Sequence, residues 1–196
     1  MKRRISLLAA ALLAAFSLTG CVKVIDKGTE GQYTGQVAFD AAADSSGDWG
    51  AISEEIIGKA AELGSLLSGE GIATPASAVS GTATVKEFVS KANGKKNSLV
   101  LELEGYDGKE NITMQIGSIY SDTVIRDLQT LKNFESFTNQ TEWSQYAKAL
   151  NAEMHTQVVE PLGIDENVVG KKVTFAGGAN RTGDDVVITP VSLTIE

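Results

Sequence analysis

The chain has 196 residues and a formal charge of −8, with 25 acidic and 17 basic side chains. Nucleic-acid phosphates repel so acidic a protein, so we expect no nucleic-acid partner. One cysteine and one histidine leave no internal disulfide and no zinc-finger spacing, and no Asp-x-Asp-x-Asp loop suggests calcium. We therefore expect no metal and no cofactor.

The first twenty residues have the pattern of a secretory signal peptide, with three cations at positions 2–4. The apolar run at 5–16 is too short to span a bilayer, which needs about 20 apolar residues. It leads into Leu18-Thr19-Gly20-Cys21, which resembles a bacterial lipobox. We predict cleavage after Gly20 and lipidation of Cys21 by acyl chains such as palmitate, two or three of which anchor a protein stably. The alternative is an ordinary signal peptide with a chance cysteine.

Cleavage would remove three cations and no acids, changing the formal charge from −8 to −11. The mature protein would be held at a membrane of the cell envelope by its lipid, facing the periplasm or the exterior. Residues 21–31 would form a tether. Val22, where Asp would resemble an inner-membrane retention signal, favours the outer membrane of a diderm host.

A strand and a helix are predicted in the segment 32–79. The strand would span Gln32 to Asp40, Ala41 to Gly50 would form an acidic turn, and the helix would run from Ala51 to Leu67. Its apolar stripe comprises Ile52, Ile56, Ala60, Leu63 and Leu67. This helical spacing predicts packing against a sheet, with docking of a partner as the alternative.

From residue 80 the period of the pattern changes to two, which is typical of strands. Strands are predicted over Thr82–Ala92, Leu99–Leu103 and Ile112–Ile116. Asn93-Gly94 predicts a turn, because both residues tolerate positive φ. The three strands should form an antiparallel meander.

A mixed connection and a second helix follow the meander. The connection spans Arg126–Phe137, and its apolar residues Leu128, Leu131, Phe134 and Phe137 are expected to be buried. The helix should span Gln140–Glu160, with Asn139 as N-cap, Glu142 completing a capping box and Pro161 ending it. Its apolar stripe comprises Trp143, Ala147, Leu150, Met154 and Val158.

Two strands, Lys171–Phe175 and Val186–Ile195, are predicted to close the chain. A hairpin loop would begin at Gly177-Gly178 and run through Asp184-Asp185, while Pro190 indicates an edge or a bulge. The fold class is α+β: an OB-like five-stranded antiparallel barrel over 80–196, in the order β-β-β-α-β-β, preceded by an N-terminal strand and helix. The Trp143 stripe would plug one end. The alternative is a sheet with one helix-covered face.

Six short segments, standing in one order along the chain, carry a family resemblance. They are Gln115–Gly117, Thr123–Asp127, Phe137–Gln140, Ala149–Asn151, Gly170–Phe175 and Ile188–Val191. Together they resemble the predicted periplasmic lipoproteins of domain-of-unknown-function family 2291, over nearly the whole mature chain. In the family pattern a proline follows Gly117 and a glycine precedes Thr123; here Ser118 and Asp122 stand there. Members are often encoded beside sugar-type ABC transport systems, so the resemblance implies transporter components as possible partners.

Arg126-Asp127 and Asn139-Gln140 are the candidate site residues. Arg126, followed by an acid, could bind a carboxylate or a sugar hydroxyl, or form a structural ion pair that orders the loop. The Asn139 and Gln140 amides could contact a polar ligand, although N-capping also explains Asn139. Trp143 could stack on a sugar, but core packing is the favoured role.

Catalysis is not expected from these residues. His155 falls on the polar side of its helix without a Gly-x-Ser-x-Gly elbow, and the adjacent acidic pairs indicate solvated carboxylates. We expect a lipid-anchored accessory or binding protein associated with ABC-type uptake of small polar solutes such as sugars. The alternative is a protein-interaction module at the envelope, and a hydrolase using His155 is a remote third possibility.

Overall fold

A computed structural model of the protein describes residues 39–196. The signal peptide, Gly20, Cys21, the tether and most of the predicted strand Gln32–Asp40 lie outside the described residues. Phe39 and Asp40 are not in a strand. Instead, the Asp40 carboxylate accepts hydrogen bonds from the backbone N–H groups of Ala42 and Ala43, each at 3.1 Å, and caps the first helix.

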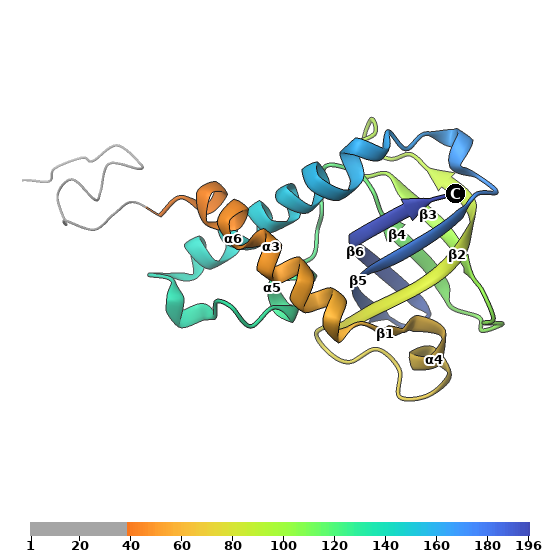
Figure 1. Ribbon diagram of the computed structural model, residues 1–196, viewed down its shortest axis with the longest axis horizontal. Coiled ribbons are helices and arrows are strands. Elements are labelled where there is room, and N and C mark those ends of the chain that lie inside the picture. The colour runs from red at the N-terminus through yellow and green to blue at the C-terminus, as the bar shows by residue number, and fades with distance from the viewer. Residues whose placement is uncertain (1–38) are drawn as a thin grey trace, which may run out of the picture. The chain divides into compact units, whose positions relative to one another are not determined.

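Five strands close into a barrel of the predicted OB-like type (Figure 1). The strands are β2 (Ser77–Val89), β3 (Ser98–Leu103), β4 (Asn111–Gln115), β5 (Lys172–Thr182) and β6 (Asp185–Ile195). They pair in the order β2-β3-β4-β6-β5, and β5 pairs back to β2. The predicted meander, β2-β3-β4, is confirmed as antiparallel. The predicted boundary at residue 80 falls inside β2.

One strand pair differs from the predicted antiparallel barrel. β4 and β6 are parallel, and the other four pairs are antiparallel. A closed ring of five strands cannot alternate in direction throughout, so one pair has to be parallel. The helical connection between β4 and β5 makes this possible, since parallel neighbours cannot be joined by a tight hairpin.

The inside of the barrel is filled by side chains that alternate along the strands. In β3 the predicted inward residues Leu99, Leu101 and Leu103 are buried, whereas Glu102 between them is exposed. β5 and β6 contribute further aliphatic and aromatic side chains to the core. These buried residues are Val173, Phe175, Ala179, Val186, Ile188, Val191 and Leu193.

The first helix begins ten residues earlier than predicted. Helix α3 spans Ala41–Lys59, so the predicted acidic turn is its first half. Gly47 and Gly50 lower helix propensity there, but a buried face formed by Ser45, Trp49, Ile52 and Ile56 overrides it. The predicted core packing is confirmed, because α3 packs against α6 and strands β2, β5 and β6.

The predicted helix also ends early, at Ala60, which has an extended conformation. The two-residue strand β1 (Ala61–Glu62) then pairs in parallel with β2, and α4 (Leu63–Ser68) follows. The Glu62 carboxylate accepts hydrogen bonds from the backbone N–H groups of Gly64 and Ser65 and caps α4. Because Glu62 caps a new helix that begins at Leu63, the apolar stripe predicted for one helix is divided between α3 and α4.

Gly177-Gly178 was predicted to begin a hairpin loop, and this prediction is wrong. β5 continues through both glycines, and the hairpin turns at Gly183, which has φ of 63°. The glycines permit close approach: a Cβ on Gly177 would overlap the Thr189 carbonyl oxygen, and one on Gly178 would lie 2.6 Å from Leu128 Cδ1. The register shifts here, opposite Pro190, as predicted for a bulge.

A helical layer lies beside the barrel and joins β4 to β5 (Figure 1). It comprises α5 (Val124–Leu128), the 3₁₀ turn η1 (Phe134–Ser136) and α6 (Gln140–Met154). A π turn η2 (His155–Val159) and two 3₁₀ turns, η3 (Glu160–Leu162) and η4 (Glu166–Val168), complete the connection. The predicted helix Gln140–Glu160 is therefore α-helical only as far as Met154.

The predicted N-cap of α6 is confirmed, because Asn139 Oδ1 accepts a hydrogen bond from the Glu142 N–H at 3.0 Å. Glu142 reaches back to the Thr138 N–H instead of the Asn139 N–H. The Trp143 stripe was predicted to plug one end of the barrel; its first residue, Trp143, does not, since α6 packs against α3 and α5, whereas η2, which contains Val158, contacts β6. Trp143 lies among aromatic rings of the helical layer instead.

Candidate functional site

The predicted pair Arg126-Asp127 lies in α5 and forms an ion pair. Arg126 Nη2 and Nε donate to Asp127 Oδ1 at 2.6 and 2.9 Å, and Thr123 Oγ1 donates to Asp127 Oδ2 at 2.5 Å. The two charged side chains are only 14% and 20% exposed. The guanidinium carbon lies 4.5 Å from the centre of the Trp143 ring. These contacts order the loop, and they leave little of the Arg126 guanidinium accessible to a ligand.

Asn139 and Gln140, the second predicted pair, lie on the surface at the start of α6. Asn139 is used as the helix cap. Trp143, a few residues further on, stacks on Tyr146 with their ring centres 6.3 Å apart. It also contacts the rings of Phe134 and Phe137. The structure thus brings Arg126 and Trp143 together in an aromatic cluster that is part of the packing.

The single histidine pairs with a tyrosine. Tyr120 Oη and His155 Nδ1 share a hydrogen bond of 3.2 Å at the start of the π turn. Burial and the nearby Asp122 carboxylate raise the pKa of the Tyr120 phenol well above its usual range, so it stays protonated. Within residues 39–196, no group of three or more His, Cys, Asp and Glu side chains could hold a metal ion.

Asp122 joins the barrel to the helical layer through a buried polar network. Its carboxylate accepts hydrogen bonds from Gln115 on β4 and from Thr189 on β6, the latter at 3.1 Å. Its backbone carbonyl accepts from Asn151 Nδ2 on α6 at 2.9 Å. Thr189 is fully buried. The sequence pattern does not reveal this network, because its members are neutral or isolated along the chain.

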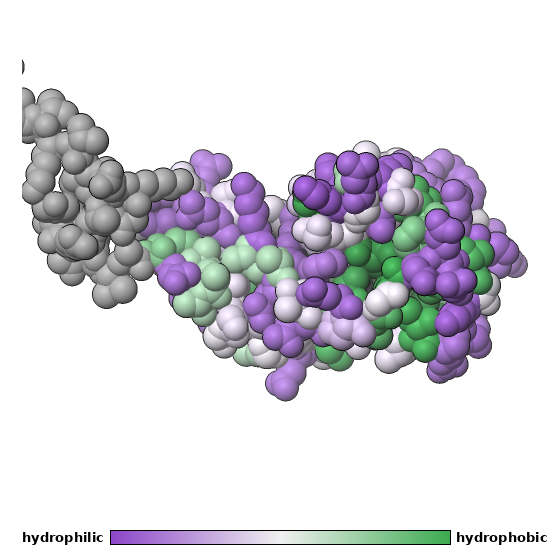
Figure 2. Space-filling view, turned by 90° about the horizontal axis from the view of Figure 1, so that it is seen from above, coloured by the Kyte–Doolittle hydropathy of each residue, from purple (hydrophilic) through white to green (hydrophobic). Residues whose placement is uncertain are grey.

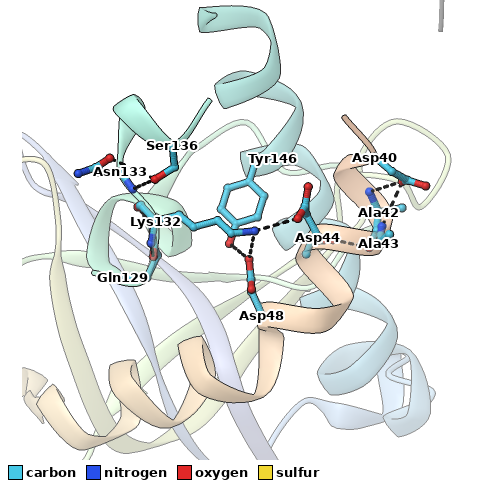
Figure 3. A network of polar contacts seen from close by, with 11 residues as sticks. Asp40, Ala42, Ala43, Asp44, Asp48, Gln129, Lys132, Asn133, Ser136 and Tyr146 are labelled. Carbon is cyan, nitrogen blue, oxygen red and sulfur yellow. Dashed lines mark hydrogen bonds and ion pairs between the residues drawn. The ribbon is translucent and has the colours of Figure 1, made fainter. Parts of the chain in front are cut away.

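A second network, also missed by the sequence analysis, ties Lys132 to α3 (Figure 3). Lys132 Nζ lies 2.9 Å from Asp44 Oδ1 and 2.7 Å from Asp48 Oδ2, and Tyr146 Oη donates to the same Asp48 oxygen at 2.7 Å. Burial opposes protonation of Lys132, but its hydrogen bonds to Asp48 and Asp44 raise its pKa. Burial and the hydrogen bond to Asp48 raise the pKa of Tyr146. The network fixes the segment 129–136 on α3.

A hollow of about 350 Å³ lies beside the barrel. It is lined by Phe88 near the end of β2 and by Ile164, Asp165, Glu166 and Asn167. Asp165 caps the short turn η4 by accepting from the Asn167 N–H at 2.9 Å. Glu166 is exposed and its carboxylate makes no hydrogen bond or ion pair with the described residues. Asn167 Nδ2 donates to Asp165 Oδ2 at 3.1 Å, so the hollow combines an aromatic side chain, the Glu166 carboxylate and the Asn167 amide oxygen.

The surface around the barrel is mixed in character. Seen from above, hydrophobic residues gather over the barrel between hydrophilic ones (Figure 2). A hollow in such a surface can hold a small molecule with apolar and polar faces, because protein ligand sites combine apolar walls with a few polar groups. No helix within residues 39–196 is long and apolar enough to cross a membrane.

Comparison with protein families decides the relationship of the chain. A family model described as predicted periplasmic lipoprotein (DUF2291) matches residues 11–194. The chain belongs to this family. The predicted family resemblance is therefore confirmed, and the family's description supports a location in the cell envelope.

The fold of this DUF2291 member is shared with a solved structure. A crystal structure of an OB-fold protein from Thermotoga maritima matches it with a TM-score of 0.55 and 14% sequence identity. The match covers 81% of this chain and 99% of the other. It confirms the OB-like fold and, at this identity, nothing about function. A search of curated proteins found no match.

Proposed function

We propose that this protein is a lipid-anchored, non-enzymatic binding protein that assists ABC-type uptake of small polar solutes such as sugars. The observation that carries the proposal is the hollow beside the barrel, whose lining includes Phe88, Glu166 and Asn167. Membership of a family of predicted periplasmic lipoproteins supports the location that such a role needs.

The lining of the hollow suits a neutral sugar for three reasons. The C–H face of a sugar ring packs on an aromatic side chain such as Phe88. Carboxylate and amide oxygens accept hydrogen bonds from its hydroxyl groups, which favours Glu166 and Asn167 as contacts. The acidic lining and the overall charge of −8 oppose anionic solutes.

Lipid anchoring is proposed at Cys21, after cleavage behind Gly20. It rests on the sequence Leu18-Thr19-Gly20-Cys21 after an apolar run. Mass spectrometry of the protein from membranes should find an acylated N-terminal cysteine. Cys21→Ser should release the protein into the soluble fraction, and an unmodified thiol in the wild type would contradict the anchor.

A non-catalytic role is supported by the contacts of the most reactive side chains. His155 shares its Nδ1 hydrogen bond with Tyr120, and Asp127 is paired with Arg126. A partner-docking role for the predicted helix 51–67 gains less support. Its apolar residues Ile52 and Ile56 are fully buried against the rest of the protein.

Ligand binding can be tested on the soluble body with a panel of sugars and nucleosides. A bound sugar at about 100 times its Kd should raise the Tm by several degrees, since it stabilises by about 2.7 kcal/mol. Phe88→Ala and Glu166→Gln should each weaken binding about tenfold. Phe134→Ala, which changes an exposed phenylalanine outside the hollow, should not. The absence of any shift across the panel would contradict the proposal.

The proposed association with transporter components has a separate test. Detergent-solubilised membranes should yield a solute-binding protein or a permease subunit with the tagged chain, and the solute should change the amount recovered. Failure to recover any transport component under mild cross-linking would leave ligand binding possible but remove the uptake role.

A further inference from the structure

Two large apolar side chains project from the segment between α5 and α6. Leu131 and Phe134 are each 51% exposed, the highest values among the large apolar residues exposed in the described part of the chain. Both residues were predicted to be buried, and this prediction is wrong. We call the segment 129–136 the apolar turn, because these two residues dominate its surface.

The apolar turn is held rigidly by side-chain hydrogen bonds. Gln129 is 7% exposed; its Nε2 donates to the Lys132 carbonyl at 2.5 Å, and its Oε1 accepts from the Lys132 N–H at 2.8 Å. Thr130 donates its N–H and hydroxyl to the Glu55 carboxylate of α3 at 3.0 and 2.6 Å. Ser136 and Asn133 form a capping box. These hydrogen bonds fix the backbone of the turn, so Leu131 and Phe134 are held in exposed positions.

Aromatic packing supports the turn from behind. The Phe134 ring meets Trp143 edge to face, with 6.4 Å between ring centres. Trp143 stacks in turn on Tyr146, which is fully buried. An exposed phenylalanine on a rigid aromatic base is suited to enter an apolar phase, because insertion costs it little conformational entropy.

The apolar turn lies beside the first turns of α3. Lys132 pairs with Asp44 and Asp48 in the first turns of α3 (Figure 3). The start of α3 and the apolar turn are at the same end of the helical layer, away from the barrel (Figure 1). Residues 22–38 separate Cys21 from Phe39 and can reach about 60 Å when extended.

We propose that Leu131 and Phe134 insert into the interface of the membrane that carries the lipid anchor, as a second contact of the protein with that membrane. This inference rests on the proposed anchoring at Cys21. Two side chains alone bind a bilayer only weakly, but a tether raises their effective concentration at its surface. Insertion would fix the orientation of the barrel on the membrane. It would therefore also fix the direction in which the hollow opens.

The charges around the turn predict which lipids it prefers. Asp40 and Glu135 are exposed there, and the Lys132 ammonium is already paired with two carboxylates. A negative rim is repelled by anionic head groups. The turn should therefore insert better into zwitterionic than into anionic membranes, and salt should reduce the difference.

The test uses the only cysteine of the chain as the anchoring point. The chain 21–196 is coupled through Cys21 to a maleimide phospholipid in phosphatidylcholine vesicles whose acyl chains carry bromine, a quencher of tryptophan. Trp143 beside Phe134 reports insertion, whereas Trp49 is 9% exposed and gives a constant background. We expect a roughly twofold decrease in the Trp143 signal compared with unbrominated vesicles.

Matched variants separate insertion from mere proximity. Leu131→Ser with Phe134→Ser should abolish the quenching, and Ile119→Ser, which changes a residue 46% exposed near the β2–β3 hairpin, should preserve it. Circular dichroism checks the fold, and Phe134→Ser alone replaces the double variant if that fails to fold. Added phosphatidylglycerol should reduce quenching at low salt.

Two results would overturn the inference: an anchored wild type with unquenched Trp143, or quenching that is equal in the wild type and in the variant Leu131→Ser with Phe134→Ser. Because the lipid is attached chemically, the result does not depend on whether cells acylate Cys21. It is also independent of sugar binding at the hollow. A failure here would thus leave the proposed function standing.

Discussion

At the scale of single residues, the most informative side chain is Lys132. Its ammonium links the apolar turn to Asp44, 88 positions away along the chain, and to Asp48. A lone lysine in a mixed connection gives no sequence signal for such a contact, because neither partner lies within a helical turn of it. The adjacent pair Arg126-Asp127 could be recognised, but its burial against Trp143 could not.

Lys132→Met should lower the free energy of unfolding by about 1–3 kcal/mol, because it leaves two half-buried carboxylates without their cation. Lys109→Met is the matched control, since Lys109 and its partner Asp184 are 77% and 58% exposed. It should leave stability nearly unchanged. Urea unfolding of both variants measures the difference, and equal midpoints would contradict a stabilising role for the Lys132 network.

Glu55 makes stability depend on pH. Burial opposes its ionisation, but hydrogen bonds from Lys59 and Thr130 prevail and lower its pKa from the ordinary 4.5 to about 2. The unfolded chain then binds the proton more readily, so the contribution of Glu55 is complete above pH 4.5 and is lost as the pH falls towards 2. Glu55→Gln should cost about 1 kcal/mol at pH 7, a modest value for a carboxylate near the surface. The difference in unfolding free energy between the variant and the wild type should disappear as the pH falls from 4.5 to 2. A difference that stays constant over this range would show that it does not come from the ionisation of Glu55.

At the scale of elements, strands were predicted better than helix ends. The alternation of Leu99, Leu101 and Leu103 identifies β3 because period-two burial is local information. The extent of α3 depends on its packing against α6 and the barrel, which local propensity at Gly47 and Gly50 opposes. The prediction for Gly177-Gly178 was wrong for a related reason. A glycine pair in a sequence indicates either a turn or a close approach of another segment to the backbone, and only the residues packed against it in the fold distinguish the two.

A pair of glycine substitutions tests this distinction. Gly178→Ala should destabilise the protein by about 1–3 kcal/mol, because its Cβ would overlap Val124 and crowd Leu128 of α5. Gly50→Ala should stabilise it by up to about 1 kcal/mol, because Gly50 is exposed within α3 and nothing lies within 4 Å of an added Cβ. Thermal unfolding should thus shift in opposite directions, and a stabilising Gly178→Ala would show that the approach of α5 to β5 is loose.

At the scale of the whole molecule, the barrel and the helical layer are joined as one body. Residues 40–196 form a single compact unit, and the predicted boundary at residue 80 falls inside β2. The strand pattern correctly predicts an OB-like barrel. It does not reveal the packing of α3 on the barrel and on α6, because these contacts join residues far apart in the sequence; Ile52 and Ile56 of α3 are fully buried.

This packing predicts that the barrel and the helical layer unfold together. Tryptophan fluorescence reports α3 and the helical layer, since Trp49 lies in α3 and Trp143 in α6, while far-UV circular dichroism also reports the strands. The two denaturant transitions should share one midpoint, as expected for a cooperative domain. A chain beginning at Ser77 would lack α3 and expose the surfaces that cover Ile52 and Ile56, so it should show no cooperative transition. A stable barrel from that shorter chain would mean that the helical layer is an addition to a self-sufficient OB domain. In that case the contacts that fix the apolar turn on α3 could loosen without loss of the hollow beside Phe88.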